Sequence, residues 1–338
     1  MSATNPTMTR RTALAALGSA GLGLWAMQWP QGHAGDLKAD EFSKLLPSFS
    51  EPSRHRIRHL LQDPSFSGHI PASDVKALAD NEGKTIDALM LDLLPLARTY
   101  SRPPISNFHV GAVARGASGN LYFGANLEFP GHSLGFSVHG EQSALSNAYM
   151  HADAGVAAIA VTHPPCGHCR QFMQELSPEG DLDILVEGSR VTKLSVLLPQ
   201  AFGPRNLDFK DGAFPVKEAN FAGPKGATDQ LTVAALDAAR KSYAPHTKSY
   251  SGVAIGTRSG RVYKGSYIEN AAYNPSLSPL QTALVALILA GESNSSIAKV
   301  TLVEVEGAPI SQKSVAEAVL GAIAPAVKLQ IVRVAMQA

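Results

Sequence analysis

The chain has 338 residues, of which 45% are hydrophobic and 17% charged, a composition that allows one large domain or two to three small ones with a sizeable core. Lysine and arginine number 29 against 28 aspartates and glutamates, so the net charge is +1 and the composition gives no support for a nucleic-acid-binding surface. With two cysteines in all, the chain is not a disulfide-rich secreted scaffold.

Residues 1–34 form an N-terminal extension that contains a long run without charge. Arg10 and Arg11 precede this run, and Thr12 to Gly32 carry no charged side chain. Twin arginines before a mildly apolar, Gly/Ala-rich stretch are typical of a twin-arginine leader for export to the periplasm. The run is less hydrophobic than a transmembrane anchor, so we expect no stable membrane association after the leader is removed. The alternative is a true start at Met27 and a cytoplasmic protein.

Two helical regions are expected next. Residues 35–84 are polar and interrupted by prolines, and their short apolar groups predict a small domain of two or three short helices. Residues 85–100 predict a stronger helix, which Thr85 can cap. The apolar residues that share one face of this helix are Ile86, Leu89, Met90, Leu93 and Leu94.

Residues 85–202 alternate between strand and helix patterns, which predicts an α/β layer structure. A glycine turn at 117–120 predicts a β-hairpin. The elements expected after it are a helix at 139–152, a buried strand at 155–165, a helix at 166–176 and strands at 182–188 and 193–199.

The last third of the chain repeats this unit after a Gly-, Pro- and Lys-rich linker at 203–229. Residues 252–269 align without a gap with residues 111–128, and SPLQTAL (278–284) falls on HGEQSAL (139–145). In residues 230–338, the second copy, serine and leucine replace the histidine and glutamate of the first copy, and there is no cysteine. The chain is therefore a duplicated unit in which only the first copy, residues 85–202, kept its polar site residues.

Both cysteines lie in the first copy, three positions apart. Cys166 and Cys169 at a helix start lie on one face of its first turn, and His139 begins another helix. Two thiolates and an imidazole are ligands that zinc favours, and a fourth position left to water is typical of catalytic zinc. Glu141 would lie near the metal without binding it, where a carboxylate can move protons between water and substrate.

Two other interpretations of the cysteine pair stay open. A Cys-x-x-Cys pair also fits a redox motif, but that interpretation does not explain why histidine and glutamate are lost together from the second copy. A structural zinc site would need His163 or His168 as a fourth ligand. His168 is turned about 100° from Cys169 in a helix, and the two prolines after His163 make its return to the metal awkward.

The set His139-Gly140-Glu141 followed by PCGHC fits the zinc nucleobase-deaminase signature, in which the glutamate is not a ligand. The segments PISNFHVGAVARG, YFGANLEF, EQSALSNA, PCGHCRQFMQEL and GSYIENAAYNPSLSPLQ resemble the long bacterial type of cytidine deaminase, over roughly residues 36–338. The resemblance implies a cytidine-deaminase-like fold: α/β/α layers around a mixed sheet, duplicated, with a small N-terminal helical region.

The resemblance also implies an activity and roles for residues. The activity is zinc-dependent deamination of cytidine and 2′-deoxycytidine, with one zinc per chain in the first copy and a homodimer whose active sites are completed across the interface. Asn126 and Glu128 would hold the ribose hydroxyls, Phe108 would pack beside the nucleoside and Phe202 would close over the base. The plainer alternatives are core packing for the phenylalanines and strand-end polarity for Asn126 and Glu128.

Two residues depart from the family pattern. Gly140 stands where alanine is usual, and it keeps a backbone N–H that could bind the pyrimidine carbonyl. His163 stands where an aromatic side chain is expected. A deaminase of polynucleotides or modified nucleosides and a non-catalytic zinc scaffold are the alternative functions. The near-neutral charge disfavours a polynucleotide substrate, and the intact Glu141 disfavours the scaffold.

Overall fold

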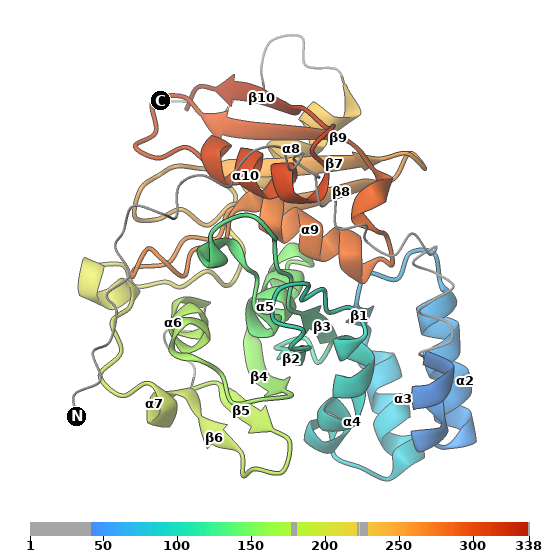
Figure 1. Ribbon diagram of the computed structural model, residues 1–338. Helices are drawn as coiled ribbons and strands as arrows, with labels where there is room; N and C mark the ends of the chain where they lie inside the picture. The colour runs from blue at the N-terminus through green and yellow to red at the C-terminus, as the bar shows by residue number, and fades with distance from the viewer. Residues whose placement is uncertain (1–41, 177–180, 222, 224–228, 337–338) are drawn as a thin grey trace, which may run out of the picture. The chain divides into compact units, whose positions relative to one another are not determined.

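The computed structural model describes residues 42–176, 181–221, 223 and 229–336 (Figure 1). The expected leader at 1–34 lies outside the described residues, so the leader and the location of the protein stay predictions. Among the helices that the structure describes, none combines the length and the apolar character needed to span a bilayer.

The N-terminal region holds the short helices expected there. They are η1 (Leu46–Ser48), α2 (Glu51–Gln62) and α3 (Ala72–Glu82). Between α2 and α3 lies a short strand, β1 (His69–Ile70), which pairs antiparallel with β3 (Leu121–Ala125). The sequence did not show this strand, which joins the N-terminal region to the edge of the first sheet.

The first copy opens with α4 (Ile86–Arg98), whose cap is the one predicted: Thr85 Oγ1 accepts a hydrogen bond from the N–H of Ala88 at 3.2 Å. The six-stranded sheet has the order β1-β3-β2-β4-β5-β6. Its β4 and β5 are parallel and the other pairs antiparallel, so the sheet is mixed. Its other elements are β2 (Gly111–Gly116), η2 (Leu134–Phe136), α5 (Gly140–Met150), β4 (Val156–Val161), α6 (Gly167–Leu176), β5 (Asp183–Val186), β6 (Thr192–Lys193) and α7 (Leu194–Leu197).

Helices cover both faces of this sheet. Gly111 lies against α4, where a Cβ would be 2.7 Å from Leu94 O, and Gly124 lies against α5, where a Cβ would be 2.1 Å from Ala144 N. Gly124 pairs with Ala112, the neighbour of Gly111, so the two glycines point to opposite faces. The helices α4 and α5 therefore lie on opposite faces, as the expected α/β/α layers require.

The strand predicted at 193–199 is wrong beyond its first residue. The structure has the short helix α7 there, after the two-residue strand β6. The carboxylate of Asp181 accepts hydrogen bonds from Ser195 N and Ser195 Oγ, at 3.1 and 3.0 Å, and so caps the turn. Leu194 is buried in the core whereas Val196 is exposed, so these two side chains do not share one face as they would in a strand.

The second copy repeats the topology of the first. Its four-stranded sheet has the order β10-β9-β7-β8, with β9 and β10 parallel, which matches β5-β4-β2-β3. The predicted duplication is thereby confirmed in three dimensions. The elements from the linker onward are η3 (Pro204–Leu207), α8 (Gln230–Arg240), β7 (Ser251–Thr257), β8 (Val262–Ser266), α9 (Pro279–Leu289), η4 (Asn294–Ser296), β9 (Ile297–Val305), α10 (Lys313–Ile323) and β10 (Leu329–Val334).

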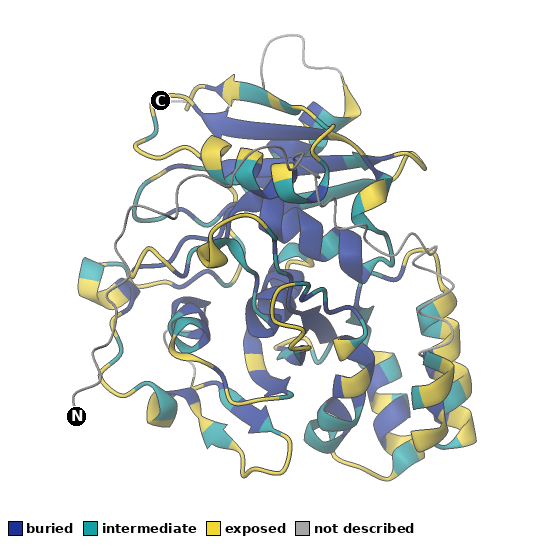
Figure 2. Cartoon of the chain, viewed as in Figure 1, coloured by how far each residue is buried: buried dark blue, intermediate teal, exposed yellow. Residues whose placement is uncertain are grey.

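The two copies share one core, in which α5 packs against α9. Leu145 of α5 belongs to the same buried cluster as Leu280 and Leu284 of α9. Both helices are buried along nearly their whole length, as their dark blue ribbons show (Figure 2). A helix covered on all sides depends on its neighbours for its position. The start of α5, where His139 and Glu141 lie, is thus held by both copies.

Candidate metal centre and active site

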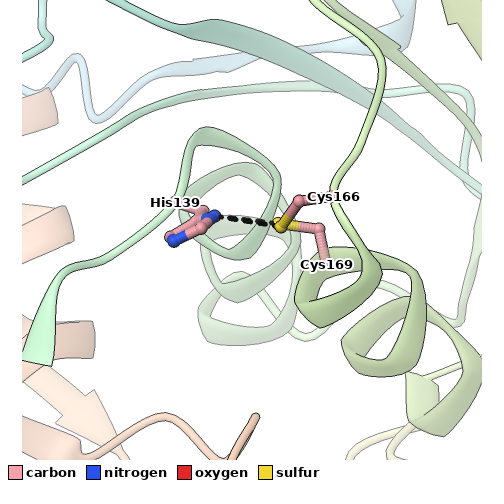
Figure 3. Close-up of side chains that lie close together, drawn as sticks. All are labelled: His139, Cys166 and Cys169. Atoms are coloured by element: carbon pink, nitrogen blue, oxygen red, sulfur yellow. Dashed lines mark hydrogen bonds between the residues drawn. The ribbon is translucent and has the colours of Figure 1, made fainter. Parts of the chain in front are cut away.

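Three predicted ligands converge between two helix starts (Figure 3). His139 is the N-cap of α5, Cys166 immediately precedes α6 and Cys169 lies in its first turn. His139 Nδ1 is 3.5 Å from Cys166 Sγ and 3.3 Å from Cys169 Sγ, and the two sulfurs are 3.6 Å apart. The three side chains from two distant segments thus face one point.

This donor set fits zinc in kind and in spacing. Tetrahedral zinc, with bonds of about 2.3 Å to sulfur and about 2.0 Å to nitrogen, holds two sulfurs about 3.8 Å apart and sulfur and nitrogen about 3.5 Å apart. The observed separations of 3.6, 3.5 and 3.3 Å agree with these values to within a few tenths of an ångström. Two thiolates with one imidazole also match the soft and borderline ligands that zinc prefers.

The two cysteines form no disulfide, and their sulfurs are hydrogen-bonded to each other. Hydrogen bonds from Cys169 and His139 lower the pKa of Cys166 to about 3. The pKa of Cys169 is raised by its hydrogen bond to Cys166 and by burial. Cys166 is therefore a thiolate at neutral pH and Cys169 a thiol, and metal binding would displace the remaining proton.

No fourth protein ligand joins the cluster among the residues that the structure describes. The ring of His168 packs against the ring of His139 at 5.3 Å between centroids, and the ring of His163 packs against Phe108 at 4.7 Å. Neither ring belongs to the group of three donors. A three-ligand site with an open position favours a catalytic over a structural metal.

Glu141 lies in the first turn of α5, two residues after His139, and is 5% exposed. Burial raises the pKa of its carboxyl group, which makes the group better able to hold a proton near neutral pH. Glu141 also lines the same cavity as His139 and Cys166. Glu141 is thus placed to exchange protons with a molecule in that cavity.

The cavity has a volume of about 470 Å³, a size suited to a small molecule. It brings together every predicted site residue except Cys169 and Phe202. Its lining residues are Ser106, Phe108, Val110, Asn126, Glu128, Leu134, Ser137, Val138, His139, Gly140, Glu141, His163, Pro164 and Cys166. Ser106, Val110, Pro164 and the 134–138 segment escaped the sequence analysis. Ser106, Val110 and Pro164 could have been found because they lie within a few positions of predicted site residues, but nothing in the sequence singled out Leu134.

Asn126 and Glu128 have structural partners and still keep capacity for a ligand. Asn126 Oδ1 accepts from Ser101 Oγ and Val110 N at 2.8 and 2.9 Å, and its Nδ2 donates to Phe108 O at 2.8 Å. Glu128 Oε2 accepts from the N–H groups of Ile105 and Ser106 at 2.8 and 2.9 Å, and Oε1 accepts from Ser106 Oγ at 2.5 Å. Among the described residues, one N–H of the Asn126 amide and one lone pair of Glu128 Oε1 have no hydrogen-bond partner, so both could bind a ligand.

The aromatic residues and Gly140 occupy different positions around the cavity. Phe108 is 52% exposed at the wall, so it is not a core residue. Phe202 is also exposed and lies outside the lining residues, with its carbonyl accepting from Gln171 Nε2 at 2.7 Å. A Cβ at Gly140 would lie 2.8 Å from Val110 Cγ1, so an alanine there would displace that wall residue.

The equivalent residues in the second copy are buried and bonded to one another. Glu269 accepts hydrogen bonds from His246 N and from Thr247 N and Oγ1, as Glu128 does in the first copy. Tyr267, at the position of Asn126, is buried with its Oη 3.4 Å from Glu269 Oε1. Leu280 at the position of Glu141 is fully buried. The second copy thus keeps the hydrogen bonds between this glutamate and the preceding loop, and lacks the histidine and glutamate of the first copy.

Comparisons with known proteins give one consistent result. Residues 84–180 and 194–317 each match the family described as "Cytidine and deoxycytidylate deaminase zinc-binding region". A cytidine deaminase of Cronobacter sakazakii is 46% identical over 264 residues, which are 78% of this chain and 89% of that protein. Cytidine deaminases of Sodalis glossinidius and Vibrio vulnificus are 43% and 42% identical over 83% and 84% of this chain and 95% and 96% of theirs. With the His-Cys-Cys cluster and the duplicated fold, these matches show that the chain belongs to the cytidine deaminase family.

Proposed function

We propose that the chain is a zinc-dependent hydrolase that converts cytidine and 2′-deoxycytidine to uridine and 2′-deoxyuridine with release of ammonia. The observation that carries the proposal is the convergence of His139, Cys166 and Cys169 beside a cavity that also holds the buried Glu141 carboxyl group. Water adds at C4 of the pyrimidine, the C4–N bond breaks and the amino group leaves as ammonia. Water and cytidine thus give uridine and ammonia, and the atoms balance.

One zinc per chain, held by the first copy, would complete the site. When bound there, Zn²⁺ supplies the Lewis acidity that lets water ionise near neutral pH. The second copy offers Ser278 and Leu280 where the first has His139 and Glu141, and a buried Tyr267 where the first has Asn126. These replacements support a stoichiometry of one.

Glu141 moves the proton in this mechanism. Its carboxylate takes a proton from the attacking water and delivers it to N3 of the pyrimidine, and it then passes the proton of the new C4 hydroxyl group to the departing amino group. Burial raises the pKa of the Glu141 carboxyl group toward neutral pH, where the group can both accept and donate a proton. The N–H of Gly140, at the cavity wall, would donate to the pyrimidine carbonyl.

A free nucleoside fits the polar groups of the cavity better than a polynucleotide does. The remaining N–H of Asn126 and the remaining lone pair of Glu128 can bind ribose hydroxyls. A carboxylate at the sugar would repel a phosphodiester. Modified nucleosides and single strands are the alternative substrates, to be tried if cytidine is not consumed.

A second subunit would cover the cavity. Phe108, Leu134 and Phe202 are large apolar side chains that are 52%, 70% and 44% exposed. The first two lie at the cavity itself, where exposed apolar surface favours contact with a partner. We therefore propose a homodimer in which each active site is completed across the interface and Phe202 closes over the base.

The test is a zinc and turnover measurement on the full chain and on Glu141→Gln. The proposal expects about one zinc per chain in both proteins, with cytidine absorbance lost only in the presence of the unsubstituted chain. The variant should lose at least about 10³-fold in kcat, since one general acid/base contributes about 10²–10⁴. A variant that loses its zinc would make Glu141 a ligand, and a zinc-loaded chain without nucleoside turnover would overturn the proposed substrate.

A further inference from the structure

Two buried glutamines link the two copies by matching hydrogen bonds. In α5, Gln142 Oε1 accepts from His139 N at 3.2 Å and Nε2 donates to Pro275 O of the second copy at 3.2 Å. In α9, Gln281 Oε1 accepts from Ser278 N at 3.0 Å and Nε2 donates to Phe136 O of the first copy at 2.6 Å. The arrangement is therefore reciprocal, with each amide capping its own helix and holding a carbonyl of the other copy.

Only one of these two bonds reaches the substrate cavity. Phe136, whose carbonyl Gln281 holds, lies within the segment 134–138, and Leu134, Ser137 and Val138 of that segment line the cavity. The carbonyl of Pro275 lies in the second copy, and Pro275 is not among the residues that line the cavity. Gln281 thus connects the zinc-free copy to a wall of the cavity in the first copy.

At one end of the segment, Val138 is buried and exchanges two hydrogen bonds of 2.8 Å with Leu127, so only the stretch before Val138 has few other bonds. Among the described residues, the other hydrogen bonds of 129–137 are local, such as Phe136 N to Ser133 O and Ser137 N to Leu134 O, each 3.0 Å. Phe136 packs against the hydrophobic core, but Leu134 is 70% exposed, so packing within this chain does not hold the Leu134 side chain. Gln281 is 5% exposed, and a buried amide with both ends bonded has a single orientation.

We propose that Gln281 is a positioning residue for nucleoside binding, through which the zinc-free copy sets the position of the 134–138 wall. The inference rests on the proposed function, because it assigns the wall to the nucleoside. The zinc ligands and Glu141 lie on α5 and α6 and keep their own contacts when the amide is lost. Loss of the amide should therefore weaken substrate binding more than it slows the chemical step.

Gln281→Glu and Gln281→Met test this role. The glutamate keeps an acceptor for Ser278 N and removes the donor to Phe136 O, whereas methionine removes both interactions. For each we expect KM for cytidine to rise about tenfold, the order expected from one lost hydrogen bond. Zinc content should stay at about one per chain, and kcat should change less than about threefold.

Thr282→Val is the matched control. Thr282 is the next residue of α9, is equally buried, and donates from Oγ1 to Ser278 O at 3.1 Å within its own copy. Its loss should lower stability without changing KM. Hydrogen exchange of peptides covering 129–138 gives a readout that is independent of activity: exchange should accelerate in both Gln281 variants and stay unchanged in Thr282→Val.

Two results would overturn the role of Gln281. The first is unchanged KM and unchanged exchange in the Gln281 variants, and the second is an equal effect in Thr282→Val. If the unsubstituted chain does not deaminate cytidine, the proposed function fails, but the exchange measurement still decides whether Gln281 holds the wall.

Discussion

Gly124→Ala should move the start of α5 and so disrupt the metal centre from a distance. A Cβ at Gly124 would lie 2.1 Å from Ala144 N and 2.6 Å from Gly140 O, both backbone atoms of α5. Ordinary contact needs about 3.4 Å, so β3 and α5 must separate by about 1 Å. The helix that would shift carries His139 and Glu141 at its first residues.

The size of the expected effect follows from the small displacement of its ligands that a metal site tolerates. Cys166 and Cys169 lie at α6, which Gly124 does not contact, and zinc ligand distances are held to about 0.2 Å. A displacement of about 1 Å at a catalytic group costs about 10²-fold in rate. The overpacking itself should lower the free energy of unfolding by about 1–3 kcal/mol. We therefore expect loss of zinc or at least about a hundredfold loss of kcat/KM.

Gly252→Ala is the internal control for this prediction. A Cβ at Gly252 would lie 2.2 Å from Ala239 N and 2.4 Å from Ala235 O, the same kind of close approach, between β7 and α8 of the second copy. Urea unfolding, zinc content and cytidine turnover should be measured for both variants. Similar destabilisation with zinc and turnover lost only in Gly124→Ala is the expected result. If Gly124→Ala keeps one zinc and turns over within about threefold of the unsubstituted chain, the coupling of β3 to the metal centre is refuted.

Three further substitutions test other parts of the structure. Cys166→Ser should reduce zinc from about one per chain to near zero, and with it the stability that zinc adds, about 4 kcal/mol at a thousandfold excess over Kd; zinc analysis and thermal unfolding measure both. Glu128→Gln should raise KM for cytidine about tenfold or more, because it weakens the ribose acceptor and the brace on Ser106; steady-state kinetics with kcat little changed supports the assignment. Burial lowers the pKa of His69 and His151 in the folded chain. As pH falls below about 6.5, the unfolded chain therefore binds protons before the folded chain does, and the free energy of unfolding should decrease until the pH has passed the folded pKa values. His69 Nε2 is buried without a hydrogen-bond partner among the described residues, so His69→Phe should flatten this fall in urea unfolding between about pH 5 and 7.

Local patterns predicted much of the fold because local physics decides those elements. The apolar face and Thr85 cap of α4, and the hairpin that turns at 117–120, depend on residues a few positions apart. The apolar run at 193–199 misled the analysis because its conformation depends on Asp181, which caps Ser195 from outside the run. The strand β1 was missed because two residues carry no periodic signal, and only their pairing with β3 makes them a strand.

The metal ligands could be predicted from the sequence because the second copy of the unit can be aligned with the first. Residues that the two copies differ in, such as His139 and Ser278, stand out against those they share. Residues that the copies share are not singled out in this way, and Gln142 and Gln281 were recognised only as a repeat match. Their bonds across the interface required the packing of α5 against α9, which no spacing along the chain encodes.

Tyr267 gives the second copy a permanent substitute for a bound molecule. An open cavity completes its hydrogen bonds only when a ligand arrives, so its walls gain stability with ligand concentration by mass action. A copy whose own phenol already lies 3.4 Å from the corresponding carboxylate, Glu269, has no such dependence. The chain thus joins a copy whose cavity walls gain stability from a bound nucleoside to a copy whose own phenol already contacts the corresponding carboxylate, and because the two copies share one core, protection by substrate against heat should extend to both.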